Sequence, residues 1–132
     1  MMHFENSSQA IYLQIVEYVC EQIILGEWPV GEKIPSVREL GVALEVNPNT
    51  VMRSYEVLKN EQIIFDKRGI GNFVDSKGQD KALSYLQQEF TAKALPQVFK
   101  TMFLLKMGVE DLKKPFEQFI KNYASTTDAD AS

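Results

Sequence analysis

The side chains best suited to recognising a ligand lie in the stretch VNPNTVMR, residues 46–53. Arg53 carries a planar guanidinium whose parallel donors match O6 and N7 of guanine. Asn49 has an amide of the kind that contacts base edges, and the Thr50 hydroxyl suits a phosphate oxygen. These residue types, so close together in the chain, indicate contact with a nucleic acid.

Each of the three also has a simpler structural explanation. Asn49 and Thr50 could merely satisfy the free amides of a first helical turn. Arg53 could form an ion pair with Glu56, three residues further along a helix. For Asn49 both roles stay open; for Arg53 we favour base contact and for Thr50 phosphate contact.

A second candidate group is Lys67, Arg68 and Gly69, in the stretch KRGIG. Two β-prone runs flank it in IIFDKRGIGNFV, which predicts a two-stranded hairpin whose glycines permit positive φ. The cations could simply be solvated at the hairpin tip. Because glycine also permits close approach of a backbone to phosphate, we expect phosphate or minor-groove contact from this tip.

The stretch SVRE has the pattern of a capping box. The Ser36 hydroxyl can accept from the Glu39 amide while the Glu39 carboxylate reaches back to the Ser36 amide. A short helix is therefore predicted from Val37. Arg38, at its start, either pairs with a carboxylate such as Glu39 or Glu45 or contacts a DNA phosphate, and we favour the phosphate.

A tight corner is predicted at residues 45–47, where this short helix meets the next one. Asn47 is a strong N-cap and Pro48 suits the first position of a new helix, where its missing amide proton costs nothing. The new helix has a buried stripe of Val51, Tyr55 and Leu58. At about 100° per residue, Asn49, Arg53 and Asn60 lie nearly opposite that stripe. The first turn therefore presents a polar face that the packing of the helix does not use.

An amphipathic helix is predicted before these elements, over SSQAIYLQIVEYVCEQIILGEW. Its apolar residues recur at four-residue steps: Ile11, Ile15, Val19 and Ile23. Ser7 or Ser8 is available as the N-cap, and Gly26 as a left-handed terminator.

Beyond the hairpin, DSKGQD at residues 75–80 is predicted to be a linker. Two or three amphipathic helices follow it, with apolar positions at helical spacing: Leu83, Leu86, Phe90, Ala94, Val98, Met102, Leu105, Leu112, Phe116, Phe119 and Tyr123. Pro96 suits the first turn of one helix and Gly108 its end, while Pro115 either lies in the first turn of the last helix or kinks it. The final STTDADAS is expected to be disordered.

Composition excludes several classes of protein. The 132 residues are 45% apolar, enough for one small core and an appendage. No apolar run predicts a signal peptide or membrane span, so we expect a cytoplasmic protein. The lone Cys20 reads as a small buried hydrophobe. With His3 the single histidine and no Cys/His cluster, we expect no enzyme, no cofactor and no metal site.

The order helix, short helix, corner, helix and hairpin is that of a winged helix-turn-helix. The chain also resembles the GntR-type bacterial transcription regulators, through IYLQI, ILGEWPVGEKIPSVREL, LEVNPNTVMRSYEVL and RGIGNFV between about residues 10 and 74. The resemblance implies a homodimer on an operator, with the helix after the corner in the major groove and the hairpin, or wing, along the minor groove. The implied DNA contacts are Arg38, Asn49, Thr50, Arg53, Lys67, Arg68 and Gly69.

The stretch NPNTV resembles the YtrA-type subfamily, in which a short helical C-terminal segment dimerises. Three positions depart from the usual family pattern. Pro48 and Met52 stand where many relatives have basic residues, which removes two expected DNA contacts. Gln62 stands where a glycine usually ends the helix, so we expect that helix to end differently, since glutamine tolerates a left-handed backbone poorly.

The expected fold is mainly α with a small β-hairpin. Residues 1–77 are predicted to form the DNA-binding domain, and residues 78–132 an antiparallel helical dimerisation segment with a disordered tail. We expect a repressor that binds a palindromic operator in double-stranded DNA. The alternative is a winged-helix protein-interaction module, which the net charge of −4 and Met52 would suit. A small-molecule effector is not expected.

Overall fold

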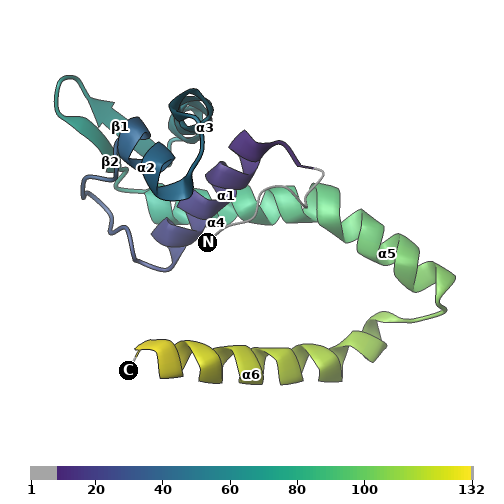
Figure 1. Cartoon of the computed structure of the whole chain (residues 1–132). Helices are drawn as coiled ribbons and strands as arrows, with labels where there is room; N and C mark the ends of the chain where they lie inside the picture. The colour runs from purple at the N-terminus through teal and green to yellow at the C-terminus, as the bar shows by residue number, and fades with distance from the viewer. Residues whose placement is uncertain (1–8, 132) are drawn as a thin grey trace. The chain divides into compact units, whose positions relative to one another are not determined.

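The computed structural model describes the backbone of residues 9–131 and the side chains of residues 9–126. The chain forms two compact units, the first ending at Glu89 and the second beginning at Phe90 (Figure 1). The elements are mostly helices with one two-stranded antiparallel hairpin, which confirms the predicted fold class.

Helix α1, Ile11–Ile24, supplies the centre of the first unit's core. Ile15, Val19 and Ile23 are buried as predicted, whereas Ile11 is 44% exposed. The N-cap is Ala10, with no capping side chain; the predicted caps Ser7 and Ser8 lie outside the described residues. Gly26 has φ +78°, so the predicted left-handed terminator is confirmed.

Cys20 lies on the buried side of α1 and is fully inaccessible. Burial, with the nearby Glu17 and Glu21 carboxylates, raises the pKa of its thiol to about 12. Because the thiolate is the reactive form of cysteine, this residue acts as a core hydrophobe, as the sequence predicted.

Helix α2, Val37–Leu44, begins at the predicted capping box. Helix α3, Pro48–Asn60, begins after the N-cap Asn47 with Pro48 in its first turn. Between the two helices Glu45 takes a left-handed conformation, φ 58°, which makes the corner tight. Helix α3 packs against both α1 and α2.

The wing consists of β1, Ile64–Lys67, and β2, Gly71–Val74. Their antiparallel register pairs Phe65 with Phe73, whose rings stack with centroids 5.6 Å apart. The segment before α2 also bonds to β2: Gly31 donates to the Val74 carbonyl, and Lys33 forms a bridge with Phe73.

The end of α3 departs from the prediction made for Gln62. This residue adopts the left-handed conformation after all, with φ 61°. That conformation costs about 1–2 kcal/mol for a residue with a Cβ, and the next residue offsets the cost. Ile63 is fully buried, and its amide donates to the Leu58 carbonyl at 2.9 Å.

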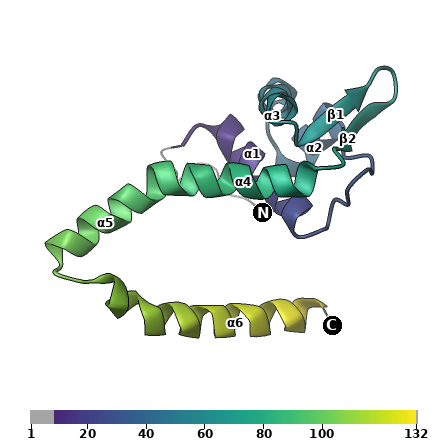
Figure 2. The same cartoon turned by 180° about the vertical axis from the view of Figure 1, so that it is seen from behind.

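Helix α4, Gly78–Glu89, lies within the first unit, which extends past Lys77 to Glu89. The helix starts within the expected linker and packs against α1, which it crosses at an angle in both Figure 1 and Figure 2. Ala82 is buried in the core, with Leu86 packed at its edge. A Cβ on Gly78 would lie 2.5 Å from the Ile63 carbonyl oxygen, so this close approach requires glycine. The first unit therefore includes α4.

The second unit contains a π-helical turn, Phe90–Ala94, then α5, Leu95–Leu104. A 3₁₀ turn, Val109–Leu112, leads into α6, Lys113–Ala131. Pro96 and Pro115 lie in the first turns of α5 and α6, as predicted.

One expectation for the second unit is wrong. Gly108 does not end α5; Lys106 is the left-handed residue after that helix, and Gly108 instead begins the 3₁₀ turn, where its amide donates to Asp111.

Substitution of Gly78 tests whether α4 belongs to the first unit's core. In Gly78→Ala the added methyl group meets backbone atoms that cannot move aside, so we expect the free energy of unfolding to fall by about 1–3 kcal/mol. Lys81→Ala, an exposed change on the same helix, is the control and should stay within about 0.5 kcal/mol of the wild type. Urea denaturation measures both; equal stabilities would contradict the close packing.

Candidate nucleic-acid interface

The start of α3 is fixed by its own capping and by its contact with α2. The Asn47 side-chain oxygen accepts from the Asn49 amide at 2.8 Å. A Cβ on Gly41 of α2 would lie 3.0 Å from the Val46 carbonyl oxygen, so Gly41 lets the corner fold closely against α2. Gly41 was not among the predicted residues, because its role depends on this packing.

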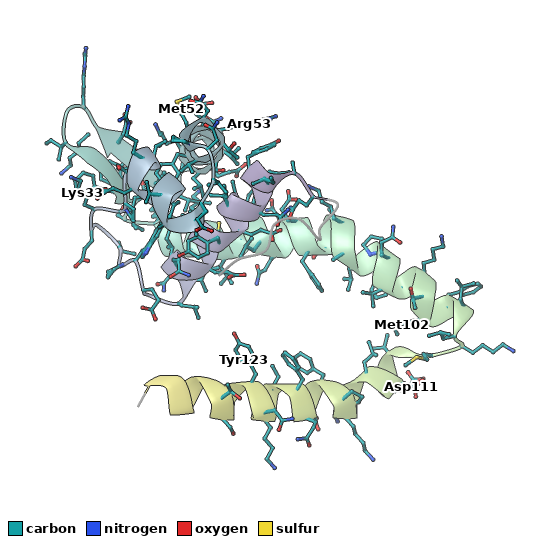
Figure 3. All side chains as sticks on the ribbon, viewed as in Figure 1. Lys33, Met52, Arg53, Met102, Asp111 and Tyr123 are labelled. Atoms are coloured by element: carbon teal, nitrogen blue, oxygen red, sulfur yellow. The ribbon has the colours of Figure 1, made fainter. Side chains whose placement is uncertain are left out.

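Helix α3 has one buried and one exposed face. Val51, Tyr55 and Leu58 are almost completely inaccessible. On the other face Asn49, Met52, Arg53 and Glu56 are exposed. Figure 3 labels Met52 and Arg53 on the side of α3 away from α4. The predicted polar face therefore exists, with Met52 as an apolar member.

Arg53 lies in an environment that its sequence neighbours did not predict. Its guanidinium carbon is 3.8 Å from the centroid of the Tyr12 ring on α1. Within residues 9–126, whose side chains are described, Arg53 forms no ion pair with Glu56 or any other carboxylate. The N–H donors of Arg53 are thus not committed to an acidic partner in that part of the chain.

Two buried hydroxyl groups hold α3 in place. The Ser54 hydroxyl donates to the Tyr12 carbonyl oxygen at 2.7 Å, with the Thr50 carbonyl also within 3.1 Å. The Tyr55 hydroxyl donates to the Pro35 carbonyl at 2.7 Å, and burial raises the pKa of that phenol. Helix α3 is therefore bonded to α1 and to the segment before α2. Thr50, which was expected to contact a phosphate, is only half-exposed.

Arg38 is the second residue of α2, and its side chain is exposed. In the described part of the chain it pairs with neither Glu39 nor Glu45. The Glu39 carboxylate instead accepts from the Ser36 amide at 2.9 Å, while the Ser36 hydroxyl accepts from the Glu39 amide at 3.1 Å. Hydrogen bonding to Ser36 lowers the pKa of Glu39.

The wing carries the second set of cations. Lys67, Arg68 and Gly69 are all exposed, and Gly69 has φ +77°. The Lys67 ammonium lies 4.8 Å from the centroid of the Phe73 ring. Beside them a shallow hollow of about 440 Å³ extends to Lys59 at the end of α3, so three cations, Lys59, Lys67 and Arg68, border one recess with the single carboxylate of Asp66.

Lys33 and Lys59 are cations of this region that sequence reasoning missed. Lys33, labelled in Figure 3, crosses the wing so closely that a Cβ on Gly71 would lie 2.6 Å from its Cε. Lys33 precedes α2, and Lys59 occupies a half-exposed position late in α3. No local motif contains either residue; only the bridge to β2 and the shared recess bring them to the wing.

Comparison with known proteins agrees with this geometry. Residues 11–74 match the family described as "Bacterial regulatory proteins, gntR family". The regulator YhcF of Bacillus subtilis is 32% identical over 86% of this chain and 93% of its own length. The chain belongs to the GntR family of bacterial regulatory proteins.

Other GntR-family similarities extend this result. The B. subtilis transcriptional repressor YtrA is 40% identical over 56% of this chain and 57% of its own, which agrees with the predicted YtrA-like assignment. A Bacteroides thetaiotaomicron GntR-family structure matches with a TM-score of 0.70 and 38% identity, covering 86% of this chain and 99% of that one. S. agalactiae BusR in complex with its busAB-promotor DNA matches with a TM-score of 0.62 and 25% identity, over 91% and 54%.

The chain is therefore a GntR-family DNA-binding transcriptional regulator. The names of these relatives describe transcription regulators rather than enzymes, in keeping with the prediction of a non-enzyme. Among the described residues no helix is long and apolar enough to cross a membrane. No group of three or more His, Cys, Asp or Glu side chains in the same residues could hold a metal ion.

The capping box at the start of α2 predicts a pH-dependent contribution to stability. A carboxyl whose pKa is lower in the folded chain stabilises the fold above its unfolded pKa, about 4.3 for glutamate, and this stabilisation disappears as the pH falls through the folded value. We therefore expect Glu39→Ala to be less stable than the wild type at pH 7 and the gap to shrink below pH 4. Chemical denaturation across this range measures the gap.

The control for this experiment is Glu27→Ala, which removes an exposed carboxylate outside any capping box. It should show no comparable gap at pH 7. A gap for Glu39→Ala that stayed constant down to pH 2.5 would mean that the carboxylate does not stabilise the cap.

Proposed function

We propose that this protein is a sequence-specific repressor that binds a palindromic operator as a homodimer in the bacterial cytoplasm. In the proposed complex, α3 enters the major groove and the wing follows the minor groove. Asn49 and Arg53 contact base edges, while Arg38, Thr50, Lys67, Arg68 and Gly69 contact phosphates or the minor groove. The observation that carries the proposal is the exposed polar face of α3 opposite its buried stripe.

The position of the cations supports DNA binding despite the net charge of −4. Helix α3 and the wing place Lys59, Lys67 and Arg68 around one recess, and Arg38 adds an exposed guanidinium at the start of α2. Salt screens interactions between charges more than about 8–10 Å apart, so such a local group can attract phosphates while carboxylates elsewhere repel them weakly.

The second unit supports the proposed homodimer through the apolar side chains that it leaves in solvent. Phe103 of α5 is 82% exposed. Along α6, four large apolar residues at helical spacing are about half-exposed or more: Phe116, Phe119, Ile120 and Tyr123. Monomeric proteins rarely expose a contiguous apolar stripe of this kind. A second copy would cover it and would match a two-fold operator.

One apolar groove in the second unit was considered as an effector site. It is open, has a volume of about 290 Å³, and is lined by Gln97, Val98, Thr101, Met102, Leu105 and Met107. Pockets for small ligands usually have about 300–1,000 Å³ and enclose most of the ligand. With only two polar side chains to orient a ligand, the groove suits apolar packing better than effector recognition.

Sequencing genomic DNA that the purified protein retains tests the proposed function directly. We expect enriched fragments to share a palindrome whose half-sites are about 10 bp apart or a multiple of this spacing. Enrichment without a palindrome would count against the dimeric operator complex. No enrichment at all would favour the protein-interaction module.

Substitutions in α3 and in the wing should weaken operator binding in different ways. Arg53→Ala removes a base contact, so we expect a loss of about 1–3 kcal/mol at the operator and relaxed preference at one base pair. Arg68→Ala removes a phosphate or groove contact and should weaken all duplexes similarly, lowering the log–log salt dependence by about one unit. Titrations at several salt concentrations measure both. Wild-type behaviour of both variants would contradict these assignments.

Charged substitutions on α6 test the homodimer. Phe119→Asp places a carboxylate in the exposed apolar stripe, so the dimer should dissociate at micromolar concentration while unfolding of the first unit is unchanged. Gln118→Asp introduces the same charge about 100° away around the helix and is the control. Light scattering measures the mass; a monomeric wild type would refute the dimer.

Truncation after Glu89 complements this test, because the first unit includes α4. We expect residues 1–89 to be a folded monomer that binds DNA weakly and with little specificity, since two half-sites are no longer held together. Equal operator affinity of the truncated and full chains would show that the second unit does not contribute.

A further inference from the structure

Tyr12 is a residue that neither the DNA-contact assignments nor the core explains. It lies in the first turn of α1, and its side chain is only partly exposed. It does not belong to the buried cluster that α1 builds with α3 and α4. Its ring instead faces α3, with the guanidinium of Arg53 above it.

Two contacts from adjacent residues of α3 reach Tyr12. The Ser54 hydroxyl donates to the Tyr12 carbonyl oxygen at 2.7 Å, and Ser54 is completely buried. The Arg53 guanidinium carbon lies 3.8 Å from the Tyr12 ring centroid. The first contact holds the Tyr12 backbone against α3, and the second places its ring beneath the neighbouring side chain.

A guanidinium carbon 3.8 Å from a ring centroid is at the separation at which the flat face of the group stacks on an aromatic ring. Its N–H donors lie in the plane of the group and point outward from its edges. Stacking therefore leaves the N–H donors of the guanidinium available for other partners, while it limits the rotation of the long Arg53 side chain. Arg53 remains exposed and, among the described residues, has no carboxylate partner.

We propose that Tyr12 is a specificity-determining positioning residue: its ring fixes the plane of the Arg53 guanidinium before DNA arrives. The proposal rests on the proposed base contact of Arg53. A flexible arginine loses side-chain entropy when it binds, whereas a preorganised one loses less. Fixing the plane also favours one bidentate geometry, that of O6 and N7 of guanine, over looser phosphate contact.

The test uses the full chain and two duplexes of equal length. One is the sequence that the wild-type protein selects from a randomised library, and the other is a scrambled version of it. Tyr12→Phe keeps the ring and should bind the selected duplex like the wild type. Tyr12→Leu removes the ring and should bind it about two- to fivefold more weakly, the range expected for an exposed cation–π contact, with little change on the scrambled duplex.

A double-mutant comparison separates positioning from a general structural effect. In an Arg53→Ala background, Tyr12→Leu should cause no further loss of selected-duplex affinity, because no guanidinium remains to be positioned. Ile11→Ala, an exposed change at the neighbouring position of α1, is the control and should leave binding unchanged. Thermal denaturation of each variant verifies that α1 remains folded.

The outcomes distinguish this inference from the proposed function. If Arg53→Ala weakens selected-duplex binding but Tyr12→Leu behaves like Tyr12→Phe, the positioning role is wrong and the Arg53 contact stands. Equal losses from Tyr12→Leu with and without Arg53 also overturn it. If Arg53→Ala binds the selected duplex like the wild type, the proposed base contact fails and the role of Tyr12 fails with it.

Discussion

Burial of one face of α3 against α1 is the constraint on which the rest of the first unit depends. Val51, Tyr55 and Leu58 are fully committed to the core, and this fixes the rotation of α3 about its axis. Truncating such a residue costs about 2–5 kcal/mol, far more than the exposed contacts nearby contribute. The direction of Asn49 and Arg53 therefore follows from side chains on the opposite side of the helix.

The wing is held by a different part of the chain. Residues 31–34 bond along β2: Gly31 and Ile34 donate to Val74 and Asn72, and the Val74 amide donates to Glu32. These bonds cover an edge of the hairpin that would otherwise present unpaired backbone groups. A two-stranded hairpin alone is only marginally stable in water. The loop before α2 therefore positions the wing, and it brings Lys33 to Gly71.

Local signals in the sequence predicted most of the first unit. The capping box at Ser36 and the Asn47–Pro48 start of α3 involve residues at most three apart, so the chemistry that sets them is visible in the sequence. The left-handed Gln62 was missed because burial of Ile63 outweighs a local preference. The start of α4 inside the predicted linker was missed because a polar, glycine-containing stretch resembles a linker unless the packing of its glycine is known.

In the candidate site, too, local sequence patterns were predictable and long-range contacts were not. Patterning along one helix predicted that Asn49 and Arg53 would be exposed, but the ring beneath Arg53 comes from Tyr12, far away in the sequence. The sequence contained only a modest signal for the role of Tyr12. It is an aromatic residue in the first turn of α1 that lies on neither the buried nor the fully polar face of that helix. Proximity between distant segments, including Lys33 against Gly71 and Lys59 beside the same recess as the wing, required the tertiary fold.

The small number of residues on α3 that are proposed to contact bases bears on why a homodimer is proposed. Pro48 and Met52 leave Asn49 and Arg53 as the polar residues proposed to read bases, and each good bidentate contact discriminates by about 1–3 kcal/mol. One copy therefore supplies roughly 2–6 kcal/mol of discrimination. A genome offers about 10⁶–10⁹ competing sites, which corresponds to about 8–12 kcal/mol. Two copies on a palindrome double the discrimination and approach this requirement, while a single first unit falls short. In the proposed dimer, the exposed apolar side chains of the second unit would serve the same end as the proposed role of the Tyr12 ring beneath Arg53, because both would increase the selectivity available from a few side chains.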